Sequence, residues 1–105
     1  MLPFFYLCPM RTKWKEIIEN AWENRDLLKD SNTVTCINSI IEEIDKGRLR
    51  TAEPTKNGWR VNDWVKKAVV MYFPIQQMET LEVGMFEFHD KIPLKKGYKE
   101  LGVRV

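Results

Sequence analysis

Cysteine, glycine, proline and histidine are all scarce in this sequence of 105 residues, which has two cysteines, five glycines, five prolines and one histidine. Cys8 and Cys36 form neither a zinc-ligand spacing nor a disulfide framework, so we expect reduced thiols in a cytoplasmic protein, with Cys36 buried for structural reasons. Apolar runs are too short to span a bilayer, which excludes a membrane protein. The composition is that of a small globular domain with one core.

A large charge of one sign is also missing. Seventeen lysines and arginines face fifteen acids, for a net charge of +2, and the two signs are interleaved along the chain. This balance excludes the basic surface that nucleic acids require. The sequence also has no glycine-rich phosphate loop, no nucleophile elbow and no metal-ligand spacing, so it indicates no catalytic residue, no metal site and no bound cofactor.

The single histidine, His89, lies beside Asp90. Adjacent residues of a strand point to opposite faces, so this pair is weak evidence for a catalytic dyad, and we expect a packing or surface role for His89.

Apolar residues recur at helical spacing in two stretches near the start. The first stretch predicts a helix over residues 13–29 with Thr12 as its cap, and the second predicts a helix from residue 34 to Gly47, which suits the C-terminal cap. Joined by the polar residues 30–33, the two form a helical hairpin. The residues that face its core are Trp14, Ile17, Ile18, Ala21 and Trp22 in the first helix and Val34, Ile37, Ile40, Ile41 and Ile44 in the second.

The middle of the chain predicts a β-hairpin followed by a third helix. Asn57-Gly58 is a two-residue turn pair that closes a hairpin between residues 48–53 and 59–61. Asn62 or Asp63 caps the helix that follows, and Pro74 ends it. The second half of this helix is apolar on nearly every side, with Val70 and Phe73 opposite the main stripe, so we expect it to be buried. Residues 68–73 also suit a buried strand, which is the main alternative. Among the tryptophans, we expect three in the core: Trp22, Trp59 and Trp64.

After Pro74 the pattern weakens. Leu81, Val83 and Met85 alternate with polar residues or glycine, which predicts a short strand, and Phe86 and Phe88 are consistent with it. Residues 95–98 suit a turn and residues 101–105 an extended exit. The fold class is therefore mainly α, with three helices and one β-hairpin inserted between the second and the third.

Several of these segments together resemble tetrahydrodipicolinate N-succinyltransferase, specifically its N-terminal domain. They are RLRTAE at residues 48–53, the Gly58-Trp59 turn and DWVKKAVVMYF at residues 63–73, with IIENAWENR at 17–25 and DKIPLK at 90–95 in agreement. The match is collinear from about residue 14 to residue 105, so we assign residues 13–105 to this domain. In that family a left-handed parallel β-helix of hexapeptide repeats follows, and this chain lacks it.

The resemblance implies an acyl transfer in the diaminopimelate route to lysine. Such enzymes move the succinyl group of the co-substrate succinyl-CoA to the amine of 2-amino-6-oxopimelate, the ring-opened form of tetrahydrodipicolinate. Their active sites lie between neighbouring subunits of a homotrimer formed through the β-helix. The acidic residue that assists the amine belongs to that β-helix, beyond residue 105.

One residue of this chain carries a site role by resemblance. The segment Gly102-Val103-Arg104-Val105 matches the end of the family's N-terminal domain, where an arginine contacts a carboxylate of the amino-dicarboxylate substrate. A guanidinium suits this role because its donors form a rigid fork that matches a carboxylate. Lys66, Lys67 and Lys91 either add positive potential for the dianion or are ordinary solvated lysines.

Two questions stay open at this point. The chain is either the substrate-side domain of a succinyltransferase, as a fragment or a truncated product, or a free-standing interaction module that has kept the fold without the reaction. Residues 1–12 form an apolar extension interrupted by Pro3 and Pro9, and they lack the basic start of a secretory signal. This extension is either a translated leader before a natural start at Met10 or a short arm that packs on the core or on a partner.

Overall fold

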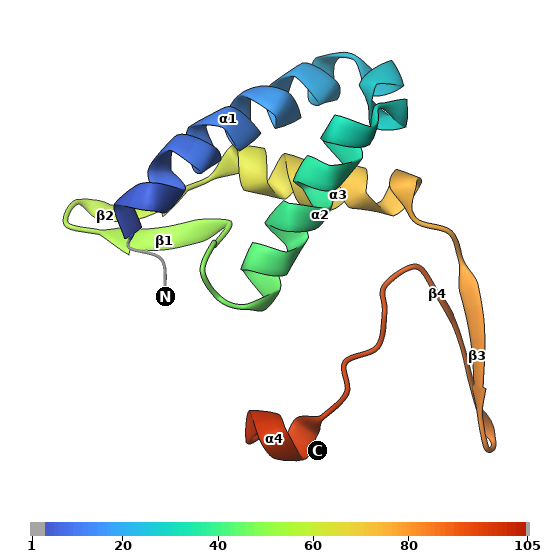
Figure 1. Ribbon diagram of the computed structural model, residues 1–105. Helices are drawn as coiled ribbons and strands as arrows, with labels where there is room; N and C mark the ends of the chain where they lie inside the picture. The colour runs from blue at the N-terminus through green and yellow to red at the C-terminus, as the bar shows by residue number, and fades with distance from the viewer. Residues whose placement is uncertain (1–3, 105) are drawn as a thin grey trace. The chain divides into compact units, whose positions relative to one another are not determined.

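The computed structural model describes the backbone of residues 4–104 and the side chains of residues 10–104 (Figure 1). The chain forms two compact units, Met1–Ile75 and Gln76–Val105, which are described in turn. The side chain of Cys8 and the C-terminal Val105 lie outside the described residues.

The first unit consists of helices that pack pairwise and one β-hairpin. Figure 1 shows α2 crossing α3, and α1 contacts both helices. In chain order the elements are α1 (Phe4–Glu23), the 3₁₀ helix η1 (Arg25–Lys29), α2 (Ser31–Asp45), β1 (Ala52–Thr55), β2 (Gly58–Val61) and α3 (Asp63–Ile75). A mainly helical domain with a hairpin between the second and third long helices is therefore confirmed.

The first helix departs from the prediction at both ends. It begins at Phe4, so Thr12 lies inside it and is not its cap, and Pro9 does not break it. A proline removes one amide donor from the ladder, and the helix continues on its other hydrogen bonds. At its C-terminal end α1 stops at Glu23, where Asn24 begins η1 and its Oδ1 accepts the N–H of Asp26 at 3.2 Å. This side-chain bond favours the tighter helix over the predicted continuation of α1.

The hairpin has the predicted place but a different turn. Thr55 pairs with Gly58, so Lys56 and Asn57 form the two-residue loop, and only Gly58 has a positive φ, of 112°. The prediction that Asn57 and Gly58 are the central pair is wrong by one residue. Trp59 is also not in the core: it is 72% exposed, because its strand lies in a two-stranded sheet whose apolar side is uncovered within this unit.

Asn62 precedes α3 in the N-cap position, where its carbonyl accepts the N–H of Val65 at 3.0 Å. Its side chain binds elsewhere, donating to the Arg50 carbonyl at 2.8 Å and so tying the start of α3 to the segment that enters the hairpin. Residues 68–73 are helical, which rules out the alternative strand. Pro74 lies within the last turn, and the helix ends one residue later than predicted.

The outer side of α3 does not follow the prediction. Val70 and Phe73 are 42% and 39% exposed, although the sequence suggested burial on all sides. Only one face of α3 contacts α1 and α2, and the residues opposite that face are left outside the core.

One hydrophobic core fills the space between α1, α2 and α3. The two aliphatic stripes of the helical hairpin meet α3 there, and the fully buried side chains include Ile18, Ile37, Ile40, Val65 and Met71. Trp64 and Cys36 belong to this core, as predicted, while Trp22 lies at its edge. The other buried members are Ala21, Leu49, Ala68 and Tyr72.

The second unit has a hairpin where a single strand was expected. β3 (Glu79–Val83) pairs antiparallel with β4 (Phe86–Asp90), and Gly84 (φ 59°) and Met85 form the loop between them. The sequence pattern missed this turn because only one of its two residues is a glycine. An irregular segment leads to the short helix α4 (Tyr98–Leu101), which replaces part of the predicted turn and extended exit.

Candidate functional site

Residue Arg104 leaves the end of α4 through a glycine turn. Gly102 has φ 72°, its N–H donates to the Lys99 carbonyl at 3.2 Å, and the Val103 N–H donates to the Tyr98 carbonyl at 2.8 Å. These two bonds are the Schellman pattern that closes a helix, and it favours glycine at the left-handed position. The Gly-Val-Arg segment thus has a structural meaning: Gly102 stops the helix, and Arg104 follows as an exposed residue in non-helical backbone.

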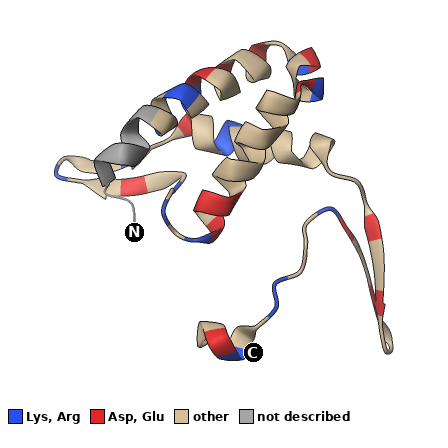
Figure 2. Cartoon of the chain, in the orientation of Figure 1, with Lys and Arg blue, Asp and Glu red and all other residues tan. Residues whose placement is uncertain are grey.

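The surroundings of Arg104 in sequence are basic. From residue 91 to residue 104 the chain has four lysines and Arg104 against one acid, Glu100. Figure 2 shows the blue Lys and Arg positions along the segment between β4 and the C-terminus. A dianionic ligand is attracted to such a segment. Lys91 belongs to it, together with Lys95, Lys96 and Lys99.

The other two lysines of interest lie on α3 in the first unit. The Lys67 ammonium donates to Glu19 at 2.8 Å and lies 5.6 Å from the ring centroid of Trp22, so a carboxylate of the protein already balances its charge. Lys66 is exposed on the outer side of the helix. Both lysines belong to the first unit, whereas Arg104 belongs to the second.

The first unit has an open pocket of about 550 Å³ between α1, the β1–β2 hairpin and the start of α3. Its charged side chains largely pair with one another: Lys67 binds Glu19, and Arg60 binds Glu53. The hydrogen bond from Arg60 is the main cause that lowers the pKa of Glu53. Four cations and three carboxylates line the pocket, so its net charge is only +1, and two of the cations are paired within it. Its remaining members are Arg11, Thr12, Lys15, Leu49, Val61, Asn62, Asp63 and Trp64.

Cys36 and His89 are the thiol and the imidazole among the described side chains. Burial raises the pKa of the Cys36 thiol to about 11, so this thiol is protonated at neutral pH and is not a nucleophile. His89 is exposed on β4, with its Nδ1 2.7 Å from the Thr80 hydroxyl, while the Asp90 carboxylate accepts the N–H of Lys91 at 2.7 Å. His89 thus lies at the surface, one of the two places, packing or surface, that the sequence predicts for it.

Metal and membrane features are likewise missing from the part of the chain that is described. Among the side chains of residues 10–104, no three His, Cys, Asp or Glu gather in a way that suits a metal ion. Over the same residues, no helix combines the length and apolar character needed to cross a bilayer.

Comparison with known proteins decides the family. A family model described as tetrahydrodipicolinate N-succinyltransferase N-terminal matches residues 13–75, well over half of the chain. The chain belongs to this family. The matched residues lie within the helical unit described above and reach its last residue, so the resemblance seen in the sequence is confirmed there.

Curated relatives extend the similarity beyond this unit. The 2,3,4,5-tetrahydropyridine-2,6-dicarboxylate N-succinyltransferase of Pelagibacter ubique is 41% identical over 88 residues, which cover 81% of the chain and 32% of the relative. The Bordetella petrii protein of the same name is 42% identical over 82 residues, which cover 74% of the chain and 30% of that relative. The Pseudoalteromonas translucida protein of the same name is 38% identical over 101 residues, which cover 87% of the chain and 37% of that relative.

Two conclusions follow from the shares of the chain and of the relatives that align. Met1–Ile75 makes up 75 of the 105 residues, so an alignment that takes in 87% of the chain necessarily includes part of Gln76–Val105. Conversely, the chain spans only about a third of the length of these relatives. What the relatives do as whole proteins is therefore a separate question for this chain.

Proposed function

We propose that this chain is the substrate-side domain of a succinyltransferase that transfers succinyl from succinyl-CoA to the amine of 2-amino-6-oxopimelate. The observation that carries the proposal is family membership, together with relatives that are named for this transfer and for a dicarboxylate acceptor. A homotrimer formed through a β-helix, as in the resembling enzymes, completes the active site in this proposal.

In this reaction the acceptor amine attacks the thioester carbonyl. A C–N bond forms, the C–S bond breaks, the amine loses a proton, and coenzyme A leaves as its thiol. The contribution of this chain is to orient the acceptor: Arg104 forms a charge-assisted, two-pronged contact with one of its carboxylates. The basic segment from residue 91 onward raises the local concentration of the dianion.

In this proposal the chain binds and orients the acceptor and does not bind the thioester. Acyl transfer depends on holding the thioester beside the oriented amine, an arrangement worth about 7–11 kcal/mol of barrier. Among the described side chains, the Cys36 thiol is buried and protonated at neutral pH, and the His89 ring bonds the Thr80 hydroxyl. In this proposal the base that receives the amine proton is the acidic residue of the β-helix, as in the resembling enzymes.

A binding experiment on the chain itself tests the role of Arg104. The probe is L-2-aminopimelate, which retains both carboxylates and the amine of the acceptor and lacks its oxo group. Titration followed by ¹⁵N NMR should move the Arg104 side-chain and Gly102 amide signals, with weak affinity, because an exposed ion pair contributes only about 0–1 kcal/mol. Arg104→Ala should abolish these shifts.

The matched control is Arg50→Ala, which removes an exposed arginine from the first unit. This variant should bind the probe as the parent chain does. Equal loss of binding in both variants, or shifts centred on the helical unit, would show that Arg104 is not the carboxylate contact.

A further inference from the structure

The short helix α4 lies between two glycines in left-handed backbone. Gly97 precedes it with φ 73° and ψ 38°, and Gly102 follows it with φ 72° and ψ 23°. A helix of four residues is too short to be stable through its own hydrogen bonds. The contacts at its two ends therefore contribute much of what stabilises it.

The C-terminal end of α4 has both hydrogen bonds of the Schellman motif. The N–H groups of Gly102 and Val103 donate to carbonyls within the helix, so the backbone is held up to the residue before Arg104. An apolar contact frequently accompanies the motif, between the positions that Tyr98 and Val103 occupy here, and both side chains are apolar in character. The direction in which the chain continues to Arg104 is therefore set by the closing of this helix.

Gly102 is the residue on which this geometry depends. A β-carbon placed at this position meets no heavy atom of a non-neighbouring residue within 4 Å, so lack of space does not explain the glycine. The backbone angle explains it, because residues with a β-carbon are disfavoured in the left-handed region. Replacement by alanine should lower the ratio of closed to open turns by about 5- to 30-fold. Asparagine should lower it less, since asparagine visits this region more readily.

The one acid of the basic segment is directed to the other end of α4. A β-carbon placed at Gly97 would lie 3.3 Å from Oε2 of Glu100, so this carboxylate lies over the N-terminal end of the helix. Arg104 follows the C-terminal end, and among the contacts of the described residues no ion pair joins it to Glu100. The fold of α4 thus separates the acid from the arginine that follows it in sequence.

We propose that Gly102 is a positioning residue for substrate binding: by closing α4 in left-handed backbone, it directs Arg104 toward the carboxylate of the acceptor. This inference rests on the proposed function, because Arg104 itself makes the contact. Two parallel N–H donors meet a carboxylate only in a narrow range of orientations, so the direction of the backbone before Arg104 affects the strength of the contact. When the turn at Gly102 is open, Arg104 keeps its charge and loses the two-pronged geometry.

Titration of the full chain with L-2-aminopimelate, followed by the ¹⁵N NMR signal of the Arg104 side chain, tests this proposal. At a fixed, subsaturating concentration of the probe, Gly102→Ala should reduce the shift of this signal by about 5- to 30-fold. Gly102→Asn should keep most of the shift. The matched control is Gly84→Ala, which makes the same replacement at another glycine with a positive φ, of 59°, and open space around it. This control should bind the probe as the parent chain does.

Two further measurements show whether Gly102 acts through Arg104. Hydrogen exchange of the Val103 amide should be faster in Gly102→Ala than in the parent chain and close to the parent rate in Gly102→Asn. In an Arg104→Ala background, Gly102→Ala should change the binding of the probe no further, because both replacements affect the same contact.

The outcomes separate this inference from the proposed function. If Arg104→Ala abolishes the shifts and Gly102→Ala binds as the parent chain does, the positioning role is overturned and the carboxylate contact stands. Unchanged exchange of the Val103 amide in Gly102→Ala, or an equal loss of binding in Gly84→Ala, also overturns the positioning role alone. If the parent chain shows no shift, or if Arg104→Ala binds equally well, both proposals are overturned.

Discussion

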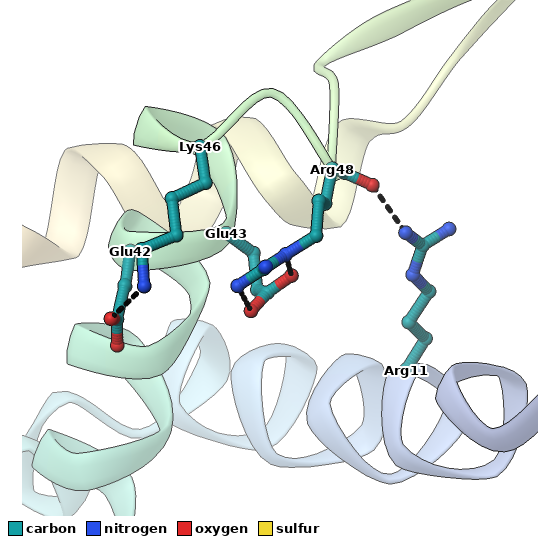
Figure 3. A network of polar contacts seen from close by, with 5 residues as sticks. All are labelled: Arg11, Glu42, Glu43, Lys46 and Arg48. Carbon is teal, nitrogen blue, oxygen red and sulfur yellow. Dashed lines mark hydrogen bonds and ion pairs between the residues drawn. The ribbon is translucent and has the colours of Figure 1, made fainter. Parts of the chain in front are cut away.

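The carboxylate of Glu43 accepts two hydrogen bonds from the guanidinium of Arg48, at 2.7 Å from Nε and 2.8 Å from a terminal nitrogen (Figure 3). The backbone repeats the connection, since the Arg48 N–H donates to the Glu43 carbonyl at 2.9 Å. Arg11 of α1 in turn donates to the Arg48 carbonyl. The end of α2, the segment that enters the hairpin and the first helix are therefore joined at one place.

This arrangement predicts a loss of stability in acid. The hydrogen bond from Arg48 is the main cause that lowers the pKa of Glu43 below its usual 4.5. A folded-state pKa below the unfolded value means that the folded chain binds the proton more weakly. The stabilisation is therefore fully present above about pH 4.5 and disappears as the pH falls through the lowered pKa. Glu53, whose pKa Arg60 lowers, acts in the same direction.

Thermal unfolding measured from pH 7 to pH 2.5 checks this dependence. Glu43→Gln should lower the midpoint at pH 7 and reduce the drop on acidification, because the variant has no carboxylate to protonate there. Glu16→Gln, at an exposed position of α1, is the control and should retain the acid sensitivity of the parent. Parallel curves for the parent chain and Glu43→Gln would contradict the assignment.

Replacing each of two tryptophans by alanine should change the free energy of unfolding by very different amounts. Trp64 belongs to the buried core and Trp59 is 72% exposed. Trp64→Ala should cost about 3–5 kcal/mol, because it leaves a cavity among the packed helices. Trp59→Ala should stay within about 0.5 kcal/mol of the parent. Urea denaturation of the two variants measures both values, and equal costs would show that one of the two environments is misassigned.

The buried thiol of Cys36 should be unreactive in the native protein. Its pKa of about 11 leaves little thiolate near neutral pH, and its side chain is 4% exposed. In a Cys8→Ser background, labelling with a thiol reagent at pH 8 should be slow and should become fast in denaturant. Rapid labelling without denaturant would place Cys36 at the surface.

The fold could be predicted where one face of an element is buried. The stripes of α1, α2 and α3 repeat at helical spacing because each helix faces the same core, and this periodicity needs no long-range information. The errors fall where local patterns are ambiguous. The Asn57-Gly58 pair predicts a positive φ for Asn57, which the Lys56-Asn57 loop does not use. The sequence also predicts Trp59 in the core, and its hairpin leaves it exposed.

The predicted burial of the apolar residues on the outer side of α3 is a second error. Val70 and Phe73 were expected to be buried because α3 is apolar on most sides, yet only one side of it packs within its unit. The apolar character of a residue indicates that burial is favourable, but it does not indicate which surface of the protein packs against that residue. The same limit applies to Arg104: its place after a helix-ending glycine is a structural finding, while its ligand follows only from the family resemblance.

The most direct test of the account is an assay of thiol release from succinyl-CoA in the presence of 2-amino-6-oxopimelate. The 105-residue chain alone should release none. Residues 13–105 grafted in place of the corresponding segment of the Bordetella petrii relative should restore turnover. In that graft Arg104→Ala should lower kcat/KM for the amino-dicarboxylate by about 10- to 100-fold, through loss of hydrogen bonds to a charged group. The KM for succinyl-CoA should stay unchanged, and Arg50→Ala should behave as the unmodified graft. Robust turnover by the isolated chain, or an Arg104→Ala graft as active as its parent, would contradict the claim that this domain supplies the substrate side alone.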